Sequence, residues 1–435
     1  MRVAIFTLGC KVNQYESAAI AEAFEDRGAL VVPFREAADL YVVNTCAVTA
    51  RAAAQGRQAL RAARRRNPAA RVVATGCQVQ VDAQRILDEV PGAICLVGND
   101  FKAQLAELAS ASEDCLEFYV GEIGRIREIP RRLLRRPPAR TRAFVRVQDG
   151  CDAFCSYCIV PFARGHSRSL PPELVHRQVE SFARAGVREV VLTGIHLGAY
   201  GQDLSPRRVL LDLLRELAPA FPEVLFRLSS LEPLEITDTL VHWAAGTPNL
   251  APHWHVPLQS GSARILARMN RRYTPGEYAE RLHRLREAMP RAAIGADVLV
   301  GFPGEEDADF LETLSFLEGL PVTYVHAFPY SARPGTLAAA LPGQVPSAVK
   351  KARVRAVRAL GETKRTAFHE AQVGRTTSCL VEDVDPATGL WRGTTPNYVR
   401  VHLSGLAAGT DHGGRRLRVR ITGQSGGRVF AEAVS

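Results

Sequence analysis

Three cysteines within eight residues, Cys151-Asp-Ala-Phe-Cys155-Ser-Tyr-Cys158, constrain this chain more than any other feature of its sequence. They follow an apolar segment, 143–147, that predicts a strand, and Gly150 allows a tight turn between strand and motif. Three thiolates on one short loop can hold three corners of a [4Fe–4S] cube and leave one iron without a protein ligand. An open metal position is typical of a site that binds and activates a small molecule.

Zinc is the alternative occupant of such a loop. It takes four ligands, usually from paired C-x2-C knuckles, and the sequence has no second knuckle. His166 is a nearby candidate for a fourth ligand, but it lies beyond an Arg-Gly turn. A disulfide framework is disfavoured because nothing marks the chain as secreted.

The first section, residues 1–136, alternates short apolar runs with alanine-rich helical patterns. Such runs predict buried parallel strands, and their alternation with helices predicts an α/β domain on a parallel sheet. The expected strands are 2–7, 40–44 and 71–75, and the expected helices are 16–27 and 49–66.

A cysteine follows each of these three strands: Cys10, Cys46 and Cys77. The carboxyl ends of parallel strands meet at one edge of a sheet, so the three thiols can converge although they are distant in sequence. A second cluster is therefore expected, and three unrelated buried cysteines are the alternative. Cys95, Cys115 and Cys379 have no such placement and are expected to be structural.

The second section, residues 137–370, follows a linker rich in proline and arginine. It contains six strand–helix units, too few for a closed eight-unit barrel. The loops after the strands carry small and polar residues that suit a nucleoside. His196, His253 and His255 also lie in this section, and the sequence assigns none of them as a ligand or a base. The expected strands are 143–147, 189–193, 224–229, 253–257, 293–300 and 323–328, and the expected helices are 173–185, 207–217, 235–245, 275–288, 305–318 and 347–370.

The last section, residues 371–435, loses helical periodicity. Four short strands between Gly, Asp and Pro turns predict a small all-β barrel. Tyr398 and Arg400 give it an aromatic–basic pair that suits RNA bases. The expected strands are 377–382, 398–403, 417–422 and 428–433.

Positive charge is concentrated in two places. The net charge is +10, seven arginines and no acid lie between 50 and 71, and nine arginines with only Glu128 lie between 125 and 146. Because solvated helix faces usually mix signs, these runs favour a nucleic-acid partner. The preference for arginine over lysine also fits a bias in genome composition.

The C-x3-C-x2-C motif, with the aromatic Tyr157 before its last cysteine, resembles the signature of radical S-adenosylmethionine enzymes. In that family the open iron binds S-adenosylmethionine, and one electron from the cluster generates a 5′-deoxyadenosyl radical. The resemblance implies a partial (βα)6 barrel open to large substrates. It also implies cofactor contacts at Tyr157, Gly194, Ser229, Glu232 and Gln259.

The whole chain resembles the methylthiotransferases within that family. The run from Thr7 to Ser17, together with Asn44-Thr-Cys46 and Thr75-Gly-Cys77, is similar to their N-terminal domain, where three cysteines hold an auxiliary [4Fe–4S] cluster that takes part in sulfur delivery. The run 395–402 resembles the TRAM module, an RNA-binding β-barrel. The resemblance implies two [4Fe–4S] clusters, held by Cys10, Cys46 and Cys77 and by Cys151, Cys155 and Cys158.

Members of the family act on an N6-modified adenosine beside the tRNA anticodon or on an aspartate of a ribosomal protein. The basic charge favours RNA. The run Gly9-Cys-Lys-Val-Asn-Gln-Tyr-Glu16 resembles the type that converts N6-threonylcarbamoyladenosine to its 2-methylthio derivative, with Lys11 central to that assignment. The isopentenyladenosine type and the ribosomal-protein type are the alternatives within the family.

A non-catalytic iron–sulfur RNA-binding protein is the alternative from another class. It explains the clusters and the charge, but not six barrel units with polar loops. The expected partners are the tRNA anticodon stem-loop, an electron-donor protein and a sulfur source. No apolar run approaches the roughly 18 residues of a membrane helix. A monomer in the cytoplasm is expected, where reducing conditions suit thiols and clusters.

Overall fold

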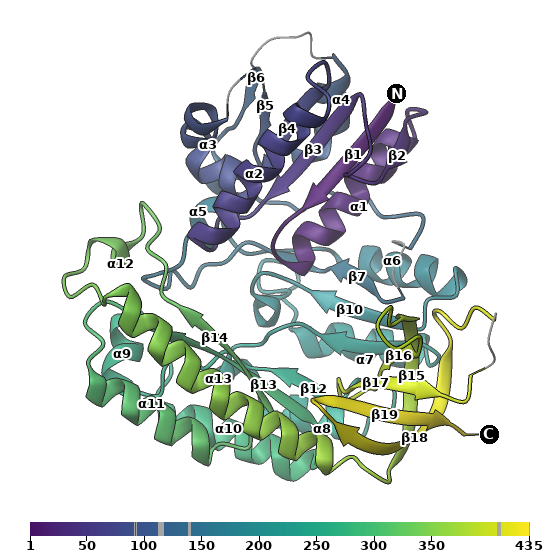
Figure 1. Cartoon of the computed structure of the whole chain (residues 1–435), viewed down its shortest axis with the longest axis vertical. Helices are drawn as coiled ribbons and strands as arrows, with labels where there is room; N and C mark the ends of the chain where they lie inside the picture. The colour runs from purple at the N-terminus through teal and green to yellow at the C-terminus, as the bar shows by residue number, and fades with distance from the viewer. Residues whose placement is uncertain (91, 93, 112–116, 138–140, 407–409, 435) are drawn as a thin grey trace.

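The computed structural model describes residues 1–90, 92, 94–111, 117–137, 141–406 and 410–434. The chain forms an N-terminal α/β part, a central part built on parallel strands and a C-terminal β-barrel (Figure 1). The purple and blue N-terminal sheet lies above the teal and green strands, and the yellow barrel lies beside them. Among the described helices, none is long and apolar enough to cross a membrane.

The N-terminal part is a six-stranded parallel sheet in the order β2-β1-β3-β4-β5-β6. Its central strands are buried at nearly every position, which explains their continuous apolar sequence. The strands are β1 (Arg2–Thr7), β2 (Leu30–Val32), β3 (Leu40–Thr45), β4 (Arg71–Gly76), β5 (Cys95–Val97) and β6 (Glu117–Tyr119), and the helices are α1 (Lys11–Glu25), α2 (Ala50–Arg66), α3 (Cys77–Glu89) and α4 (Leu105–Ala111).

Helices α1 and α3 begin at or directly after predicted cluster cysteines. Neither start was predicted from the sequence. Helix α1 begins at Lys11 rather than at residue 16, and α3 begins at Cys77. Neither start has a side-chain cap, so the usual Ser, Thr, Asp or Asn signal is missing. By contrast, α2 starts as predicted because the Thr49 side chain accepts a hydrogen bond from the Ala52 amide.

The central part contains the six predicted parallel strands. They form two sheets, β11-β10-β7 and β12-β13-β14, and a parallel bridge between Phe226 and Leu250 joins the sheets. This is the expected partial barrel. The strands are β7 (Ala143–Arg146), β10 (Glu189–Thr193), β11 (Leu225–Leu228), β12 (His253–His255), β13 (Ala293–Val300) and β14 (Tyr324–Pro329).

Alternate residues of the central strands face two different environments. Ile294, Ala296 and Val298 of β13 belong to the large apolar core that includes residues of α6, α7, α8 and α10. With the period of two, Asp297 then faces the interior of the partial barrel. The helices are α5 (Val160–Arg164), α6 (Pro172–Arg184), α7 (Leu210–Ala220), α8 (Asp238–Ala245), α9 (Ala263–Arg268), α10 (Pro275–Ala288), α11 (Asp307–Gly319), α12 (Leu337–Ala340) and α13 (Ser347–Glu370), and a short ladder pairs β8 (Gln148–Asp149) with β9 (Arg168–Ser169).

The C-terminal part is a closed barrel of five strands in the order β15-β16-β17-β19-β18. The sequence predicted four of them and missed β16, a four-residue strand that contains Gly393. Its core includes Cys379, which is fully buried as a structural cysteine would be. The strands are β15 (Thr376–Val384), β16 (Trp391–Thr394), β17 (Arg400–Ser404), β18 (Arg416–Ser425) and β19 (Arg428–Ala433).

A buried ion pair fixes this small barrel to the central part. Arg227 of β11 donates to Glu189 of β10 at 2.7 Å, and both side chains are almost fully buried. The same guanidinium donates to the backbone carbonyl of Pro396 at 2.9 Å, in the turn before β17. The ring of Tyr398 lies over this guanidinium and 4.3 Å from the ring of His253. Tyr398 therefore faces the central part, although it is still half-exposed.

Several arginines of the second basic run, and Arg57 of the first, form ion pairs with acids from other elements. Arg57 binds Glu89 of α3 at 2.6 Å, and Arg132 binds Asp26, the C-cap of α1, at 2.7 Å. The second run is therefore one-sided in sequence but has acids beside several of its arginines in space. Other pairs of this kind join Arg135 to Glu22 and Asp26, Arg142 to Glu382 and Arg146 to Glu16.

We expect Arg227→Met to destabilise the protein by about 3–5 kcal/mol, because it leaves the Glu189 carboxylate buried without its partner. The measurement is the thermal unfolding midpoint, with Arg418→Met, an exposed arginine of β18, as the matched control. Equal midpoints for the two variants would contradict a desolvated ion pair at this position.

Candidate functional site

The three cysteines of the N-terminal part lie at one edge of its sheet. They follow β1, β3 and β4, which are adjacent strands. Burial raises the pKa of the Cys46 thiol to about 12, and Cys77 and Cys10 add to that rise. Burial also raises the pKa of Cys10; Arg164 opposes this shift and Cys77 adds to it. Of the three residues, Cys46 and Cys77 are buried and Cys10 is exposed. A cationic iron–sulfur group would stabilise the thiolate form of all three.

Glycines bring the backbone close to these thiols. Gly76 has φ +96°, and a Cβ there would lie 2.4 Å from the carbonyl oxygen of Thr45. Gly9 has φ +95°, and a Cβ there would lie 3.0 Å from the Cys46 sulfur. Any other residue would be strained and would crowd the space between the strand ends.

Asn13 aligns two of the cysteine loops, a role that sequence reasoning missed. Its buried amide donates to the carbonyls of Leu8 at 2.7 Å and Thr45 at 3.0 Å, the residues that lie two before Cys10 and one before Cys46. The Thr45 hydroxyl donates to the Thr75 carbonyl at 2.6 Å and so connects the Cys77 loop to the other two. Asn13 and Glu16 follow Cys10 by three and six positions, and this polar spacing on one helix face is the sequence signal for their role.

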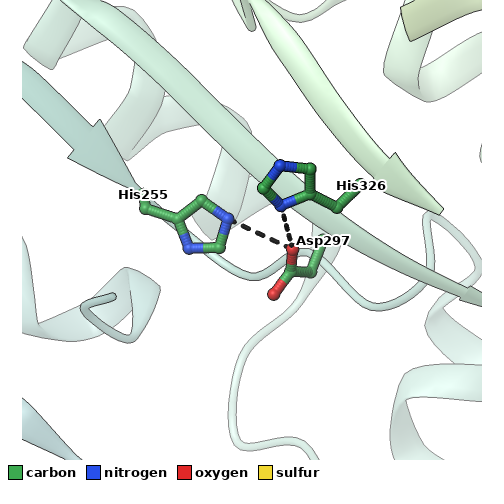
Figure 2. A group of neighbouring side chains, drawn as sticks. All are labelled: His255, Asp297 and His326. Atoms are coloured by element: carbon green, nitrogen blue, oxygen red, sulfur yellow. Dashed lines mark hydrogen bonds and ion pairs between the residues drawn. The ribbon is translucent and has the colours of Figure 1, made fainter. Parts of the chain in front are cut away.

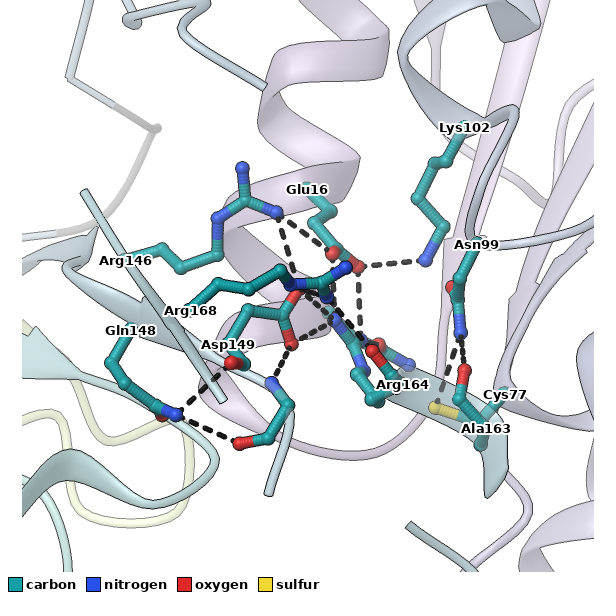
Figure 3. Close-up of polar contacts among 12 residues, drawn as sticks. Glu16, Cys77, Asn99, Lys102, Arg146, Gln148, Asp149, Ala163, Arg164 and Arg168 are labelled. Carbon is teal, nitrogen blue, oxygen red and sulfur yellow. Dashed lines mark hydrogen bonds and ion pairs between the residues drawn. The ribbon is translucent and has the colours of Figure 1, made fainter. Parts of the chain in front are cut away.

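A buried network of charges joins this edge to the central part (Figure 3). Glu16 of α1 accepts hydrogen bonds from Lys102 at 2.7 Å, Arg164 at 2.7 Å and Arg146 at 3.1 Å. Arg164 also binds Asp149, just before the Cys151 loop, at 3.1 Å. Although burial alone would raise it, these three cations hold the pKa of Glu16 well below its usual range.

The Cys151 loop presents three partly exposed thiols beside β8 and α5. The Ala153 amide donates to the Cys151 sulfur at 3.5 Å, and Arg271 lies 3.4 Å from the Cys155 sulfur. His196 lies 3.6 Å from the Cys151 sulfur. Burial raises the pKa of Cys158 to about 12. These donors would stabilise thiolate ligands of a metal cluster, so the loop fits the predicted group.

The two cysteine triads are neighbours. Cys77 belongs to a small apolar cluster with Ile159, the residue after Cys158, and Ala163. Asn99 bridges the same place, because its amide donates to the Ala163 carbonyl at 2.7 Å and lies 3.8 Å from the Cys77 sulfur. Two metal groups held by these cysteines would therefore serve one site.

A cavity of about 260 Å³ opens beside the Cys151 loop. Cys155, Glu232 and Arg271 line it, and Glu232 and Arg271 form an ion pair. His196 also lines it and binds Glu235 at 2.6 Å. The cavity lies against the Cys151 loop and has several charged side chains in its lining, which suits a charged nucleoside.

The other predicted cofactor contacts lie outside the lining of this cavity. Ser229 is buried, and its hydroxyl has no hydrogen-bond partner in the described parts of the chain. At Gly194, a Cβ would lie 2.7 Å from the Gln148 side-chain oxygen. Gln259 adopts φ +65°, and its carbonyl accepts a hydrogen bond from the Leu299 amide at 2.9 Å. Tyr157 packs against an apolar cluster that includes Met269, Phe302 and Tyr330.

Three polar side chains from the neighbouring strands β12, β13 and β14 lie together (Figure 2). His255 and His326 both point to one oxygen of Asp297, at 3.1 and 3.2 Å. Although burial would raise it, the two imidazoles hold the pKa of Asp297 well below its usual range. Their ligating atoms lie close enough together to hold a cation, although the carboxylate here already binds both rings. His253, in the same strand as His255, binds the Tyr324 hydroxyl at 2.8 Å.

The remaining cysteines lie away from both triads where the structure describes them. Cys95 is buried in β5, and burial raises the pKa of its thiol to about 12. Cys379 is buried in the small barrel. Cys115, also expected to be structural, lies outside the described residues.

Family models match two parts of the chain. The model of the uncharacterized protein family UPF0004 matches residues 2–98, which contain Cys10, Cys46 and Cys77. The model of the radical SAM superfamily matches residues 145–317, which contain the Cys151 loop and most of the partial barrel.

Curated relatives match nearly the whole chain. The threonylcarbamoyladenosine tRNA methylthiotransferase MtaB of Aquifex aeolicus is 40% identical over 412 residues, covering 93% of this chain and 97% of the relative. The protein of the same name from Bacillus subtilis is 36% identical over 425 residues, covering 96% and 93%. A tRNA-2-methylthio-N(6)-dimethylallyladenosine synthase of Sphingopyxis alaskensis is 34% identical over 434 residues, covering 98% and 96%.

A solved structure supports the fold. The radical S-adenosylmethionine methyltransferase TsrM of Kitasatospora setae, solved with cobalamin and a [4Fe–4S] cluster, superposes with a TM-score of 0.57. It is 17% identical, and the match covers 78% of this chain and 77% of TsrM.

We expect Glu16→Gln to lower the free energy of unfolding by about 3–5 kcal/mol, because Lys102, Arg146 and Arg164 would lose a shared buried anion. A carboxylate with a depressed folded-state pKa stabilises the protein above its unfolded-state value and loses this effect as pH falls. The gap in thermal midpoint between the wild type and the variant should therefore be full near pH 7 and should narrow below about pH 4.5. Glu25→Gln, an exposed change in the same helix, is the control; a gap that does not vary with pH would contradict this account.

Proposed function

This chain belongs to the methylthiotransferase family of radical S-adenosylmethionine enzymes, and we propose that it converts N6-threonylcarbamoyladenosine next to a tRNA anticodon to its 2-methylthio derivative. The observation that carries the proposal is the packing of Cys77 against Ile159, which makes the two cysteine triads neighbours. A reaction that combines C–H activation with sulfur insertion needs both groups at one substrate atom.

The two triads have different roles in this proposal. Cys151, Cys155 and Cys158 would hold the [4Fe–4S] cluster that binds S-adenosylmethionine, and Cys10, Cys46 and Cys77 would hold the auxiliary [4Fe–4S] cluster. When bound, the two clusters and S-adenosylmethionine would together supply the radical, the sulfur and, from a second S-adenosylmethionine, the methyl group.

The residues of the chain itself would bind the cofactor and position the two clusters. The Glu232–Arg271 pair and His196 line the cavity beside Cys155 and would orient the polar groups of the cofactor, with Tyr157, Gly194, Ser229 and Gln259 as the further proposed contacts. The network around Glu16 and Arg164 fixes the N-terminal sheet relative to the Cys151 loop. The distance between the two clusters would thus be set by buried ion pairs between the two parts.

The choice of tRNA nucleoside is supported by the relatives. The proteins of Aquifex aeolicus and Bacillus subtilis, at 40% and 36% identity, are named for threonylcarbamoyladenosine. The dimethylallyladenosine synthase, at 34%, represents the second candidate. We further propose that the enzyme works as a monomer in the cytoplasm with an electron-donor protein and a separate sulfur source. The parts are proposed to be residues 1–136, 137–370 and 371–435.

Cells that lack the gene should lose 2-methylthio-N6-threonylcarbamoyladenosine from their tRNA and accumulate the nucleoside without the methylthio group. Mass spectrometry of nucleosides from digested tRNA measures both. Loss of the methylthio form of the isopentenyl nucleoside alone would move the assignment to the second candidate. An unchanged set of tRNA nucleosides would favour a ribosomal-protein substrate or a non-catalytic iron–sulfur RNA-binding protein.

Single cysteine replacements should separate the two triads. Cys158→Ala should abolish 5′-deoxyadenosine formation under reductant, because the S-adenosylmethionine cluster loses a ligand. Cys10→Ala should retain 5′-deoxyadenosine formation but stop sulfur insertion into the tRNA. Cys379→Ala, which changes a buried cysteine of the small barrel, is the control and should retain both. Loss of both products in Cys10→Ala would contradict the division of roles.

A further inference from the structure

A second, larger cavity lies beside Cys10, in a place that the cofactor chemistry does not use. Its volume is about 850 Å³, and it lies between α1, the strands β7, β10, β11 and β12, and the turn before β17. Lys11, the residue after Cys10 and the first of α1, lines it. Phe144 and Val191 give it apolar walls, and Tyr398 closes it from the small barrel.

Cations outnumber acids in the lining. Lys11, Arg142, Arg227 and Arg400 face two acids, Glu382 and Asp383. The arginines have partners: Arg142 binds Glu382 at 2.8 Å, Arg227 binds Glu189 at 2.7 Å, and Arg400 lies 3.8 Å from Glu382.

Lys11 differs from these arginines. Its ammonium makes no hydrogen bond or ion pair with any residue that the structure describes, although the side chain is partly buried. The adjacent His253 is buried, and its Nδ1 atom has no hydrogen-bond partner in the same described part. Among the described residues, a partly buried ammonium without an ion-pair partner thus lies beside a buried imidazole nitrogen without a hydrogen-bond partner. Such a lining suits an anionic, hydrogen-bonding group.

The substrate proposed above carries such a group. A threonylcarbamoyl substituent on N6 ends in a free carboxylate and a hydroxyl, whereas the dimethylallyl substituent is apolar throughout. N6 and C2 of adenine both lie on the base-pairing edge of the ring. When C2 faces the cluster held by Cys10, the N6 substituent extends beside that cysteine, where the cavity begins.

We propose that this cavity binds the carboxylate of the threonylcarbamoyl group and that Lys11 is its main contact. Lys11 is then a specificity-determining residue: it selects a charged N6 substituent and disfavours an apolar one, which would leave the ammonium desolvated and unpaired. The inference rests on the proposed function, because it assigns the substituent of that substrate.

The test compares two anticodon stem-loop RNAs that differ in one group. One carries N6-threonylcarbamoyladenosine, and the other carries the analogue in which the carboxylate is replaced by a hydroxymethyl group. Binding to the cluster-loaded enzyme is measured by fluorescence anisotropy without reductant, so that no turnover occurs. The wild type should prefer the carboxylate RNA by roughly 10- to 100-fold, the effect of one charge-assisted hydrogen bond.

Lys11→Met should lose most of this preference and Lys11→Arg should keep it, while both retain their iron content and thermal midpoint. Lys351→Met, an exposed lysine of α13, is the matched control and should behave as the wild type does. A wild type without preference, or a folded Lys11→Met with full preference, would overturn the inference. The comparison of the two RNAs on the wild-type enzyme needs no variant. It therefore tests the inference even when Lys11→Met fails to take up its clusters.

The two proposals fail in different ways. Wild-type enzyme that methylthiolates the carboxylate RNA but binds both RNAs equally would remove the inference and leave the proposed function. Wild-type enzyme that forms no methylthio product on the carboxylate RNA, yet does so on an isopentenyl RNA, would remove the proposed function and the inference with it.

Discussion

The buried contact between Glu16 and Arg164 holds the two halves of the site together. Arg164 is 1% exposed, and its guanidinium binds Glu16 of α1 in the N-terminal part and Asp149 of the central part. An arginine in such a place is stable only when its partners are present and correctly placed. The pair therefore adds stability and also fixes the position of one cysteine triad relative to the other. One triad belongs to the N-terminal part and the other to the central part.

The longer strands of the N-terminal and central parts were predictable because each depends on local sequence, whereas the short strands β2, β5, β6 and β16 were missed. The assignment of the six cysteines to two clusters stays a prediction. Continuous apolar runs mark buried strands, and a cysteine after each run marks a strand end. The start of α1 was not predictable in this way, because Asn13 in its first turn donates to the carbonyl of Thr45, which lies 32 positions away in sequence. The same holds for Arg164 and Glu16, since nothing in the sequence pairs residues separated by 148 positions.

The distribution of charge differed most between the sequence and the structure. The arginines between 125 and 146 have almost no acid near them in the chain. In three dimensions Asp26, Glu16 and Glu382 approach them from α1 and from the small barrel. A tally of basic residues therefore overstates the surface that is free for phosphates. Lys11 is the opposite case: this single lysine lines a cavity and forms no ion pair with any residue that the structure describes.

The docking of the small barrel through Arg227 bears on how an RNA would be held. A binding module on a flexible tether loses translational and rotational freedom when its ligand engages both it and the catalytic part. Here the carbonyls of Thr395 and Pro396 already accept hydrogen bonds from the buried guanidinium, and the ring of Tyr398 lies against His253. The module is thus preorganised as one wall of the barrel mouth, so an anticodon loop would meet a rigid, ready-made surface and its binding would carry little entropic penalty from the protein.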